Sequence, residues 1–211
     1  MNCTSVGKRT LVRLPLYLSY LRSADIIKQH NISATAIANA LCLNQVQVRK
    51  DLAKVSGRGK PKVGYETHEL VARLEQFLGY DNVDSAVLVG AGHLGKALLS
   101  YDGFSQYGLK IVAAFDCDSA AVCEQEGSIP ILPFEKLPDF ILRMKIKLAI
   151  ITVPAKNAQD VCNALVASGI LAIWNFAPIM LSVPDGIMVQ NENMAASLAV
   201  LSNHLSTRMN S

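Results

Sequence analysis

The feature that most constrains the fold of this sequence is a glycine-rich loop, GAGHLG, at residues 90–95. The loop follows an apolar run at residues 85–89 and precedes a segment with a helical pattern. A second apolar run, residues 109–115, ends at Asp116, which lies 21 residues after Gly95. A strand, a glycine loop, a helix, a second strand and an acid in this order are typical of a dinucleotide-binding unit with a parallel sheet.

Each glycine of this loop has its own expected role. Gly90 permits the tight turn, Gly92 lets the backbone approach a pyrophosphate, and Gly95 lets the helix pack closely on the strand. The N-terminus of the helix then favours the negative charge of the phosphates. Asp116 can accept hydrogen bonds from both ribose hydroxyls and would repel a 2′-phosphate, so the pattern predicts NAD(H) rather than NADP(H). We therefore expect the nucleotide to contact Asp116 and the six loop residues, which are Gly90, Ala91, Gly92, His93, Leu94 and Gly95.

The alternation of strands and helices continues towards the C-terminus. The patterns predict strands at residues 146–153, 171–176 and 187–189, a helix at 157–168 and a final amphipathic helix at 192–207. In an open parallel sheet the ligand lies at the carboxyl ends of the strands. Residues at these strand ends are therefore expected near the ligand, namely Thr152, Pro154, Asn175, Phe176 and Ala177.

The N-terminal part of the chain differs from this unit in charge. Residues 1–80 contain 12 Lys/Arg and 5 Asp/Glu, a net charge of +7, whereas residues 81–211 have a net charge of −4. A basic part attracts the phosphate backbone of a nucleic acid irrespective of its sequence. Ordinary domains also reach such a charge, so the charge alone leaves both interpretations open.

A helix-turn-helix pattern lies within the basic part. Residues 10–30, 34–41 and 45–55 have helical patterns, and the second and third are joined by a tight turn. Ser33 and Asn44 stand where good N-cap residues of these two helices are needed.

The third of these helices has two different faces. Val48, Leu52 and Val55 share one side, and the opposite side carries amide and cationic side chains. Such side chains can contact base edges in a major groove. For one helix taken alone, a solvated amphipathic helix is the simpler interpretation. The DNA-contacting residues that we predict on this helix are Gln45, Gln47, Arg49, Lys50 and Lys54.

The next segment, residues 56–65 (SGRGKPKVGY), contains three glycines, one proline and three cations. This composition predicts a hairpin with a cationic tip. A basic hairpin directly after a helix-turn-helix is the wing of a winged-helix domain. Arg58, Lys60 and Lys62 on such a tip suit the narrow, electronegative minor groove. The alternative is a merely solvated loop.

These patterns predict an α/β protein. An N-terminal winged helix, residues 1–80, precedes a Rossmann-type doubly wound parallel sheet, residues 81–190, and a C-terminal helix, residues 191–211. In the first domain, Thr67 is predicted to cap a fourth helix at residues 68–78.

Composition argues against several other classes of protein. Hydrophobic residues make up 51% of the chain and charged residues only 18%, which is too apolar for a disordered protein. The apolar runs are far shorter than the ~20 residues of a membrane-spanning helix. The N-terminus shows no signal-peptide pattern, so we expect a cytoplasmic protein without a membrane segment. The five cysteines are scattered without C-x-x-C spacing, so we expect neither a disulfide framework nor a metal site.

Several short motifs are spread over residues 10–205. They are QVRKDL at 47–52, VGY at 63–65, the GAGHLG loop, YDGF at 101–104, Phe115-Asp116, TVPA at 152–155 and NFAP at 175–178. Taken together, they resemble the motifs of the Rex family, which are bacterial redox-sensing transcriptional repressors.

The resemblance implies a homodimer that binds a palindromic operator, with residues 45–55 in the major groove and the wing in the minor groove. It implies that NADH binds the sheet domain, closes the dimer and releases the DNA, whereas NAD⁺ competes weakly and leaves DNA binding intact. The C-terminal helix would be exchanged with the partner chain. The resemblance also adds Tyr101, Val153, Pro178 and Met194 to the expected ligand contacts, with Met194 reaching the nicotinamide pocket of the partner.

The chain departs from the family pattern in the contacts that couple ligand and DNA. The family commonly has an arginine six residues after the position of Arg13, where this chain has Ser19. It has an aspartate where this chain has Asn193, whereas the tyrosine of the network is retained as Tyr101. Losing both charged members removes a charge-assisted interaction. The departure implies an altered switch, either in the discrimination between NADH and NAD⁺ or in the coupling to DNA.

Three other functions are each compatible with part of the sequence. An NAD-dependent dehydrogenase needs an acid or base beside the nicotinamide. Of the four histidines only His93 lies near the loop, where it would face the pyrophosphate. A CoA-type nucleotide-binding module, as in succinyl-CoA synthetase α-subunits, would lack the winged helix. A DNA-binding protein that has lost its ligand response is the third, and Ser19 and Asn193 are the residues that favour it.

Overall fold

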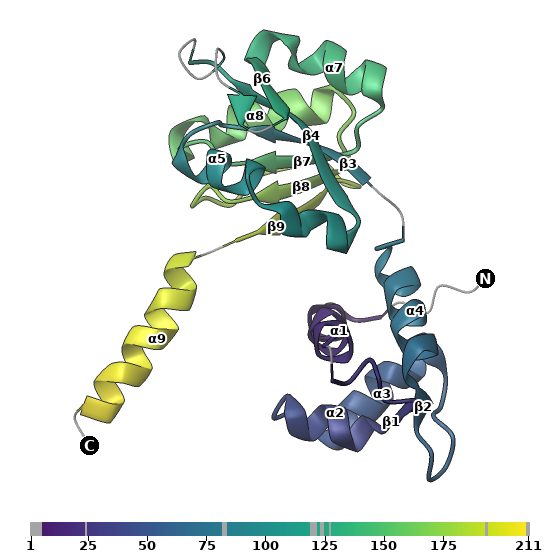
Figure 1. The fold of residues 1–211 in the computed structure, drawn as a ribbon. Coiled ribbons are helices and arrows are strands. Elements are labelled where there is room, and N and C mark those ends of the chain that lie inside the picture. The colour runs from purple at the N-terminus through teal and green to yellow at the C-terminus, as the bar shows by residue number, and fades with distance from the viewer. Residues whose placement is uncertain are drawn as a thin grey trace. The chain divides into compact units, whose positions relative to one another are not determined.

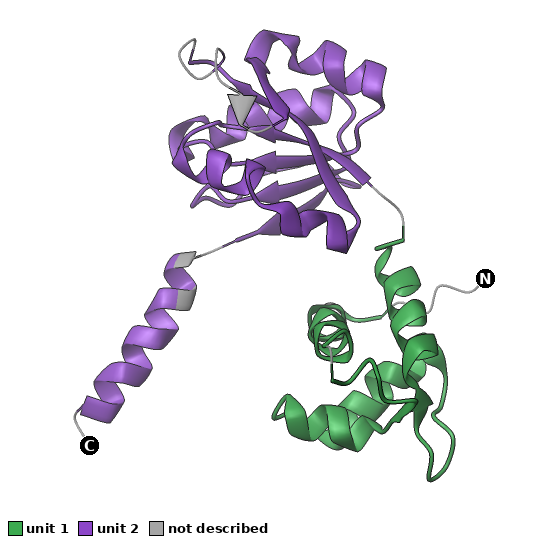
Figure 2. Cartoon of the chain, in the orientation of Figure 1, with its two compact units in different colours: residues 1–82 green, residues 83–211 purple. Residues whose placement is uncertain are grey.

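The structure is a computed structural model that describes residues 6–23, 25–81, 84–118, 122, 125–126, 128–192 and 194–209. The chain divides into two compact units, residues 1–82 and residues 83–211 (Figure 2). Each unit has its own hydrophobic core, so each is described separately.

The first unit is helical, with one short two-stranded sheet (Figure 1). Its elements are α1 (Lys8–Leu21), β1 (Asn31–Ile32), α2 (Ala34–Ala40), α3 (Gln45–Ser56), β2 (Tyr65–Glu66) and α4 (Thr67–Leu78). The helix-turn-helix pair α2–α3 is where the sequence predicts it. Apolar side chains at helical spacing form the core, which contains Leu14, Leu18, Leu21, Ile37, Val48, Leu52, Leu70 and Leu74.

The prediction of a helix over residues 10–30 is wrong in its second half. Helix α1 ends at Leu21, where the Arg22 N–H donates to the Leu18 carbonyl and the chain enters a series of turns. The segment then forms β1, which pairs antiparallel with β2. This pairing joins residues far apart in the chain, Asn31 with Glu66 and Ile32 with Tyr65, so no local helical pattern reveals it.

Side-chain caps fix the starts of three helices. Ser33 accepts from the Ala36 N–H, and Asn44 accepts from the amides of the first turn of α3, so both predicted caps are confirmed. The predicted cap of α4 is wrong, because Glu66 and not Thr67 accepts the free N–H groups there. The pKa of the Glu66 carboxyl is lowered, mainly because the carboxylate accepts a hydrogen bond from the Glu69 N–H.

The second unit is a seven-stranded sheet with helices on both faces. Its strands are β3 (Asp84–Val89), β4 (Leu109–Asp116), β5 (Gln125–Glu126), β6 (Ile129–Pro133), β7 (Leu148–Ile151), β8 (Ala172–Asn175) and β9 (Met188–Asn191). The helices are α5 (His93–Leu99), η1 (Asp102–Tyr107), η2 (Phe134–Lys136), α7 (Leu137–Met144), α8 (Ala155–Ala167) and α9 (Met194–Met209). The helix predicted at 157–168 thus begins earlier, at Ala155, and the strand predicted at 146–153 is shorter at both ends.

The strand order confirms the doubly wound topology. The order is β5-β6-β4-β3-β7-β8-β9, and every pair is parallel except β5 with β6. The chain builds outward from β3 through β4 and β6, and then returns to the other side of β3 to form β7. The switch point therefore lies between β3 and β7, next to the glycine loop, which is where open α/β sheets bind ligands.

Both faces of the sheet are covered by helices. Alternate residues of β3 point to opposite faces, so Val87 and Val89 belong to one core cluster and Leu88 to the other. Helices α7 and α8 contribute Leu137, Ile141, Val161 and Leu165 to the first cluster, whereas α5 contributes Leu99 to the second. Because the strands are buried on both faces, they carry apolar side chains on both faces, which accounts for much of the apolar content of the chain.

Helix α9 presents its apolar side chains to the surface. Leu198, Leu201 and Leu205 follow one another at helical spacing and remain 60–66% exposed.

Among the described helices none combines the length and apolar character that crossing a membrane requires. Within the described ranges, no three His, Cys, Asp or Glu side chains lie together where they could hold a metal ion.

Candidate DNA interface and nucleotide site

A groove of about 1130 Å³ separates helix α3 from the hairpin that follows it. The hairpin closes where Lys60 and Gly64 exchange two backbone hydrogen bonds of 2.8 and 2.9 Å, and it turns at residues 61–63. The predicted wing therefore exists as a short, tight hairpin.

The groove is rich in cationic side chains of the N-terminal unit. Seven of the eight predicted DNA-contacting residues line it, and all eight are exposed. Gln45 is the one that does not line it, because its amide bonds to Asn39 and Thr35 of α2. Six of the predicted contacts in the groove are cations, namely Arg49, Lys50, Lys54, Arg58, Lys60 and Lys62, and Arg13 of α1 lines it as a seventh. Such a concentration of positive charge suits a phosphate backbone.

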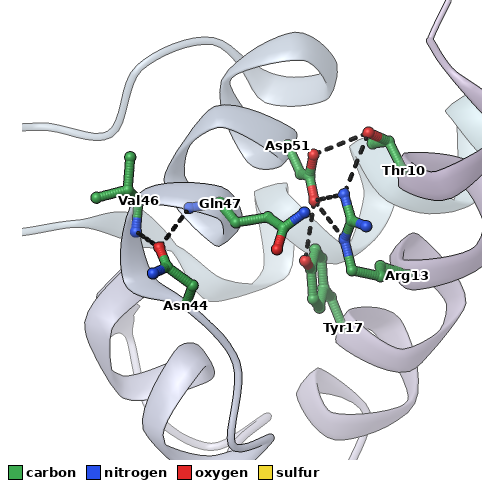
Figure 3. Close-up of polar contacts among 7 residues, drawn as sticks. All are labelled: Thr10, Arg13, Tyr17, Asn44, Val46, Gln47 and Asp51. Carbon is green, nitrogen blue, oxygen red and sulfur yellow. Dashed lines mark hydrogen bonds and ion pairs between the residues drawn. The ribbon is translucent and has the colours of Figure 1, made fainter.

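Beneath the groove, α1 and α3 are joined by a buried network around Asp51 (Figure 3). The Thr10 hydroxyl donates to Oδ1 of Asp51 at 2.9 Å, and the Tyr17 hydroxyl donates to Oδ2 at 3.0 Å. The Arg13 guanidinium reaches the same Oδ2 through Nε at 2.8 Å and Nη2 at 2.7 Å. Only 4% of the Asp51 side chain and 16% of the Arg13 side chain are exposed, so the pair is largely dry.

Burial and hydrogen bonding have opposite effects on the pKa of Arg13 in this network. Burial tends to lower the pKa of Arg13, but its contacts with Asp51 and Tyr17 outweigh burial and raise that pKa. Burial raises the pKa of the Tyr17 phenol, which therefore stays neutral and can donate its proton to Asp51. The network thus fixes α3 on α1 with one compensated charge pair.

The sequence predictions above do not include a role for Asp51. A signal for one is present, because Asp51 lies on the same helical face as Val48, Leu52 and Val55, which is otherwise apolar. An acid on a buried face requires a partner. Arg13 and Tyr17, one turn apart on α1, are the groups that could supply it.

The glycine loop has the geometry that its sequence predicts. Gly90 has φ +103°, and a Cβ there would lie 2.9 Å from the backbone of Thr152 and Val153. A Cβ on Gly95 would overlap the Gly90 carbonyl oxygen, so helix α5 packs directly on the turn. At Gly92, by contrast, a Cβ would meet no atom within 4 Å. The backbone at Gly92 is therefore open to an approaching group.

Asp116 is tied to this loop. Its Oδ2 accepts from the Ala91 N–H at 2.6 Å, and its Oδ1 accepts from the Asp118 N–H at 2.9 Å. An ionised carboxylate offers about four lone-pair sites. Two are used here, so Asp116 can hold the loop and still accept hydrogen bonds from a sugar.

The strand-end residues fall into two groups. The Thr152 hydroxyl shares its one proton between the carbonyl oxygens of Val89 and Gly90, at 3.0 and 2.7 Å, which ties the end of β7 to the glycine turn. Asn175 is fully buried, and its amide bonds to Asn191 and to the backbone of Ala177 and Ile179. These side chains shape the crevice through internal contacts.

The other predicted ligand contacts differ in exposure. Leu94, Val153 and Phe176 are half-buried, Ala91 and Ala177 are buried, and His93, Tyr101, Pro154 and Pro178 are exposed.

A row of aromatic rings that the sequence did not predict runs along the α5 face of the sheet. The ring centroids of Tyr101 and Phe104 are 4.9 Å apart, those of Phe104 and Trp174 5.8 Å, and those of Trp174 and Phe176 4.8 Å. The Trp174 indole N–H donates to Oε1 of Glu192 at 2.9 Å, just before α9. The row of rings and this hydrogen bond thus connect the YDGF motif to the residue Glu192, close to the start of α9.

Of the two departures from the family pattern, Ser19 is exposed on α1. Asn193 lies outside the described residues, as does the side chain of Met194.

Both units of the chain match models of known protein families. Residues 5–53 match a family model described as "Putative DNA-binding protein N-terminus", and residues 81–179 match one described as "CoA binding domain". The redox-sensing transcriptional repressor Rex of Treponema denticola is 41% identical over 196 residues, which is 93% of each chain.

Solved structures agree with these matches. The crystal structure of RSP in complex with NAD⁺ and operator DNA superposes with a TM-score of 0.91 at 32% identity, covering 98% of this chain and 95% of the other. The complex of RSP with NADH superposes with a TM-score of 0.88 at the same identity, covering 98% and 97%. RSP itself is a Rex-family repressor. On the strength of this similarity over nearly its whole length, the chain belongs to the Rex family of redox-sensing transcriptional repressors.

Proposed function

We propose that the protein is a transcriptional repressor whose affinity for operator DNA is set by bound NAD(H). The observation that carries this proposal is the presence, in one chain, of the cationic groove beside α3 and the glycine loop with Asp116. Relatives that match along nearly the full length are named redox-sensing repressors, and none of the full-length relatives cited above is named as an enzyme. A dehydrogenase is therefore not proposed.

In the proposed complex, α3 enters the major groove and the hairpin at residues 60–64 follows the adjacent minor groove. Two copies of the chain bind the two halves of a palindromic operator. The exposed leucines of α9, within residues 191–211, supply the apolar surface for exchange between the two copies. A DNA-binding regulator acts where the chromosome is, so we place the protein in the cytoplasm.

The ligand can act on DNA binding only if it binds the two forms of the dimer unequally. NADH is proposed to favour the form that does not match the operator. The RSP complex that contains operator DNA also contains NAD⁺, which agrees with NAD⁺ leaving the DNA bound. With Ser19 and Asn193 in place of the two charged residues, either the preference for NADH over NAD⁺ or its coupling to DNA is altered.

Lys50→Ala is expected to weaken operator binding by about 1–3 kcal/mol and to relax the preference for the base pair that Lys50 reads. The side chain is exposed on α3 and lines the groove. Fluorescence anisotropy with the operator and with a scrambled duplex measures both effects, and Lys136→Ala, an exposed lysine of the sheet unit, is the control. An equal and modest loss on both duplexes would show that Lys50 meets phosphate instead of a base.

Asp116→Ala is expected to weaken NADH binding by about tenfold or more while the ligand-free protein still binds the operator. The variant loses a charged acceptor for the ribose and the bond that holds the Ala91 N–H. Calorimetry measures the affinity, with Asp139→Ala, an exposed residue paired with Arg143, as the control. Simultaneous loss of NADH and DNA binding would mean that Asp116 has a structural role only.

The same calorimetry includes coenzyme A, because the family model that matches residues 81–179 is described as a CoA binding domain. Tight binding of coenzyme A together with no binding of NADH or NAD⁺ would replace the proposed ligand.

A further inference from the structure

The Arg13 side chain is held in one orientation by the buried network. Its Nε and Nη2 both donate to Oδ2 of Asp51, and Nη2 also lies 3.4 Å from the Thr10 hydroxyl. A planar guanidinium fixed at two nitrogens leaves little freedom for the third. The remaining N–H groups of Arg13 are therefore fixed in position as well, and Arg13 is one of the residues that line the groove.

Gln47 of α3 lies against this guanidinium (Figure 3). When its amide oxygen faces Arg13, that oxygen accepts from Nη1 and Nη2, each at 3.1 Å. The opposite orientation would bring an NH₂ donor against two other donors. The hydrogen-bonding partners thus determine which end of the amide faces Arg13.

The amide nitrogen of Gln47 is then the end left for a ligand. Gln47 is exposed and stands in the first turn of α3, the part of a recognition helix that contacts base edges. A free glutamine uses its oxygen and its nitrogen together to read adenine, accepting from N6 and donating to N7. A glutamine whose oxygen is already bonded can only donate.

We propose that the Arg13–Asp51 pair fixes Gln47 as a pure hydrogen-bond donor, so that Gln47 reads guanine, whose O6 and N7 are both acceptors, instead of adenine. The inference rests on the proposed function, because it takes α3 to be the element that enters the major groove. It makes Gln47 a specificity-determining residue and Arg13 a positioning residue that acts through it.

The test is selection from a pool of duplexes with two inverted, randomised half-sites, with sequencing of the DNA that the full-length protein retains. Wild type, Gln47→Ala and the double variant Arg13→Met/Asp51→Asn are compared. The double variant removes both charges together, and the amide that it introduces at position 51 has one oxygen that can accept from Thr10 or Tyr17 and an NH₂ that can donate to the other hydroxyl. Thermal unfolding verifies that each variant is folded.

Wild type is expected to favour G·C over A·T by about five- to tenfold at one base pair in each half-site. Gln47→Ala should lose the preference at that pair only, and the double variant should change it towards A·T. The proposal is overturned if the pair that depends on Gln47 is A·T in wild type. It is equally overturned if Gln47→Ala changes no preference, or if a folded double variant keeps G·C.

Failure of the proposed function looks different, because wild type would then enrich no duplex at all. Should the double variant not fold, the comparison of wild type with Gln47→Ala still decides between guanine and adenine, since Gln47→Ala leaves the Arg13–Asp51 pair intact.

Discussion

Asp51→Ala is expected to lower the free energy of unfolding of residues 1–82 by about 3–5 kcal/mol. The substitution leaves the Arg13 guanidinium without its counter-ion in a site where only 16% of that side chain is exposed. It also removes the acceptor of the Thr10 and Tyr17 hydroxyls. Since the network joins α1 to α3, operator binding should fall together with stability. Hydrogen exchange of the amides of α1 and α3 measures the loss in this unit.

The matched control is Glu69→Ala, which breaks an ion pair of the same kind at the surface. Glu69 and Arg73 of α4 are 58% and 49% exposed, and exposed pairs contribute about 0–1 kcal/mol. A large difference between the two variants would show that burial makes the Asp51 pair important. Equal, small losses would contradict the role of Asp51 derived from its geometry.

Gly95→Ala is the second substitution with a large expected effect. Its new Cβ would overlap the Gly90 carbonyl oxygen, which belongs to the backbone and cannot turn away. Helix α5 must then move off the turn, at a cost of about 1–3 kcal/mol or more in the free energy of unfolding. NADH binding should be lost, whereas residues 1–82 should keep their stability. Trp174, the one tryptophan of the sequence, lies in β8 and reports unfolding of this unit by fluorescence.

Gly92→Ala is expected to affect NADH affinity much more than stability. Gly92 has φ −71°, and an added Cβ meets nothing within 4 Å, so stability should fall by no more than about 1 kcal/mol, the cost of Ala in place of Gly at the N-cap of α5. A phosphate packed against this backbone would collide with the new methyl group, and NADH affinity should fall by about tenfold or more. Unchanged NADH affinity in this variant would place the phosphates away from the loop.

Where a structural signal is local, the sequence alone predicts it. The roles of Gly90 and Gly95 follow from the spacing of the loop, and the caps Ser33 and Asn44 follow from residue type and position. Each depends on neighbours within a few residues, or on a motif whose geometry is nearly invariant.

Features that depend on distant residues could not be predicted in this way. The β1–β2 pairing requires knowledge of where residue 66 lies. Because α4 begins at Thr67, one residue earlier than predicted, Glu66 takes the N-cap position in place of Thr67. Asp51 carries a visible signal, an acid on an apolar face, but its partners come from another helix.

The same limit applies to the nucleotide site. A strand end predicts that Asn175 lies at the crevice, but only the structure shows that its amide is used in internal hydrogen bonds. The hydrogen bond between Trp174 and Glu192 joins residues 18 apart that no motif connects.

The most direct test of the account is an anisotropy titration of the full-length protein on a Rex-type palindromic operator, with no ligand, with NADH and with NAD⁺. We predict that NADH weakens operator affinity by a factor within the usual range of allosteric coupling, about 5–150-fold, and that NAD⁺ weakens it less. If neither nucleotide changes the affinity for the operator, the protein does not sense NAD(H) and the central claim is wrong.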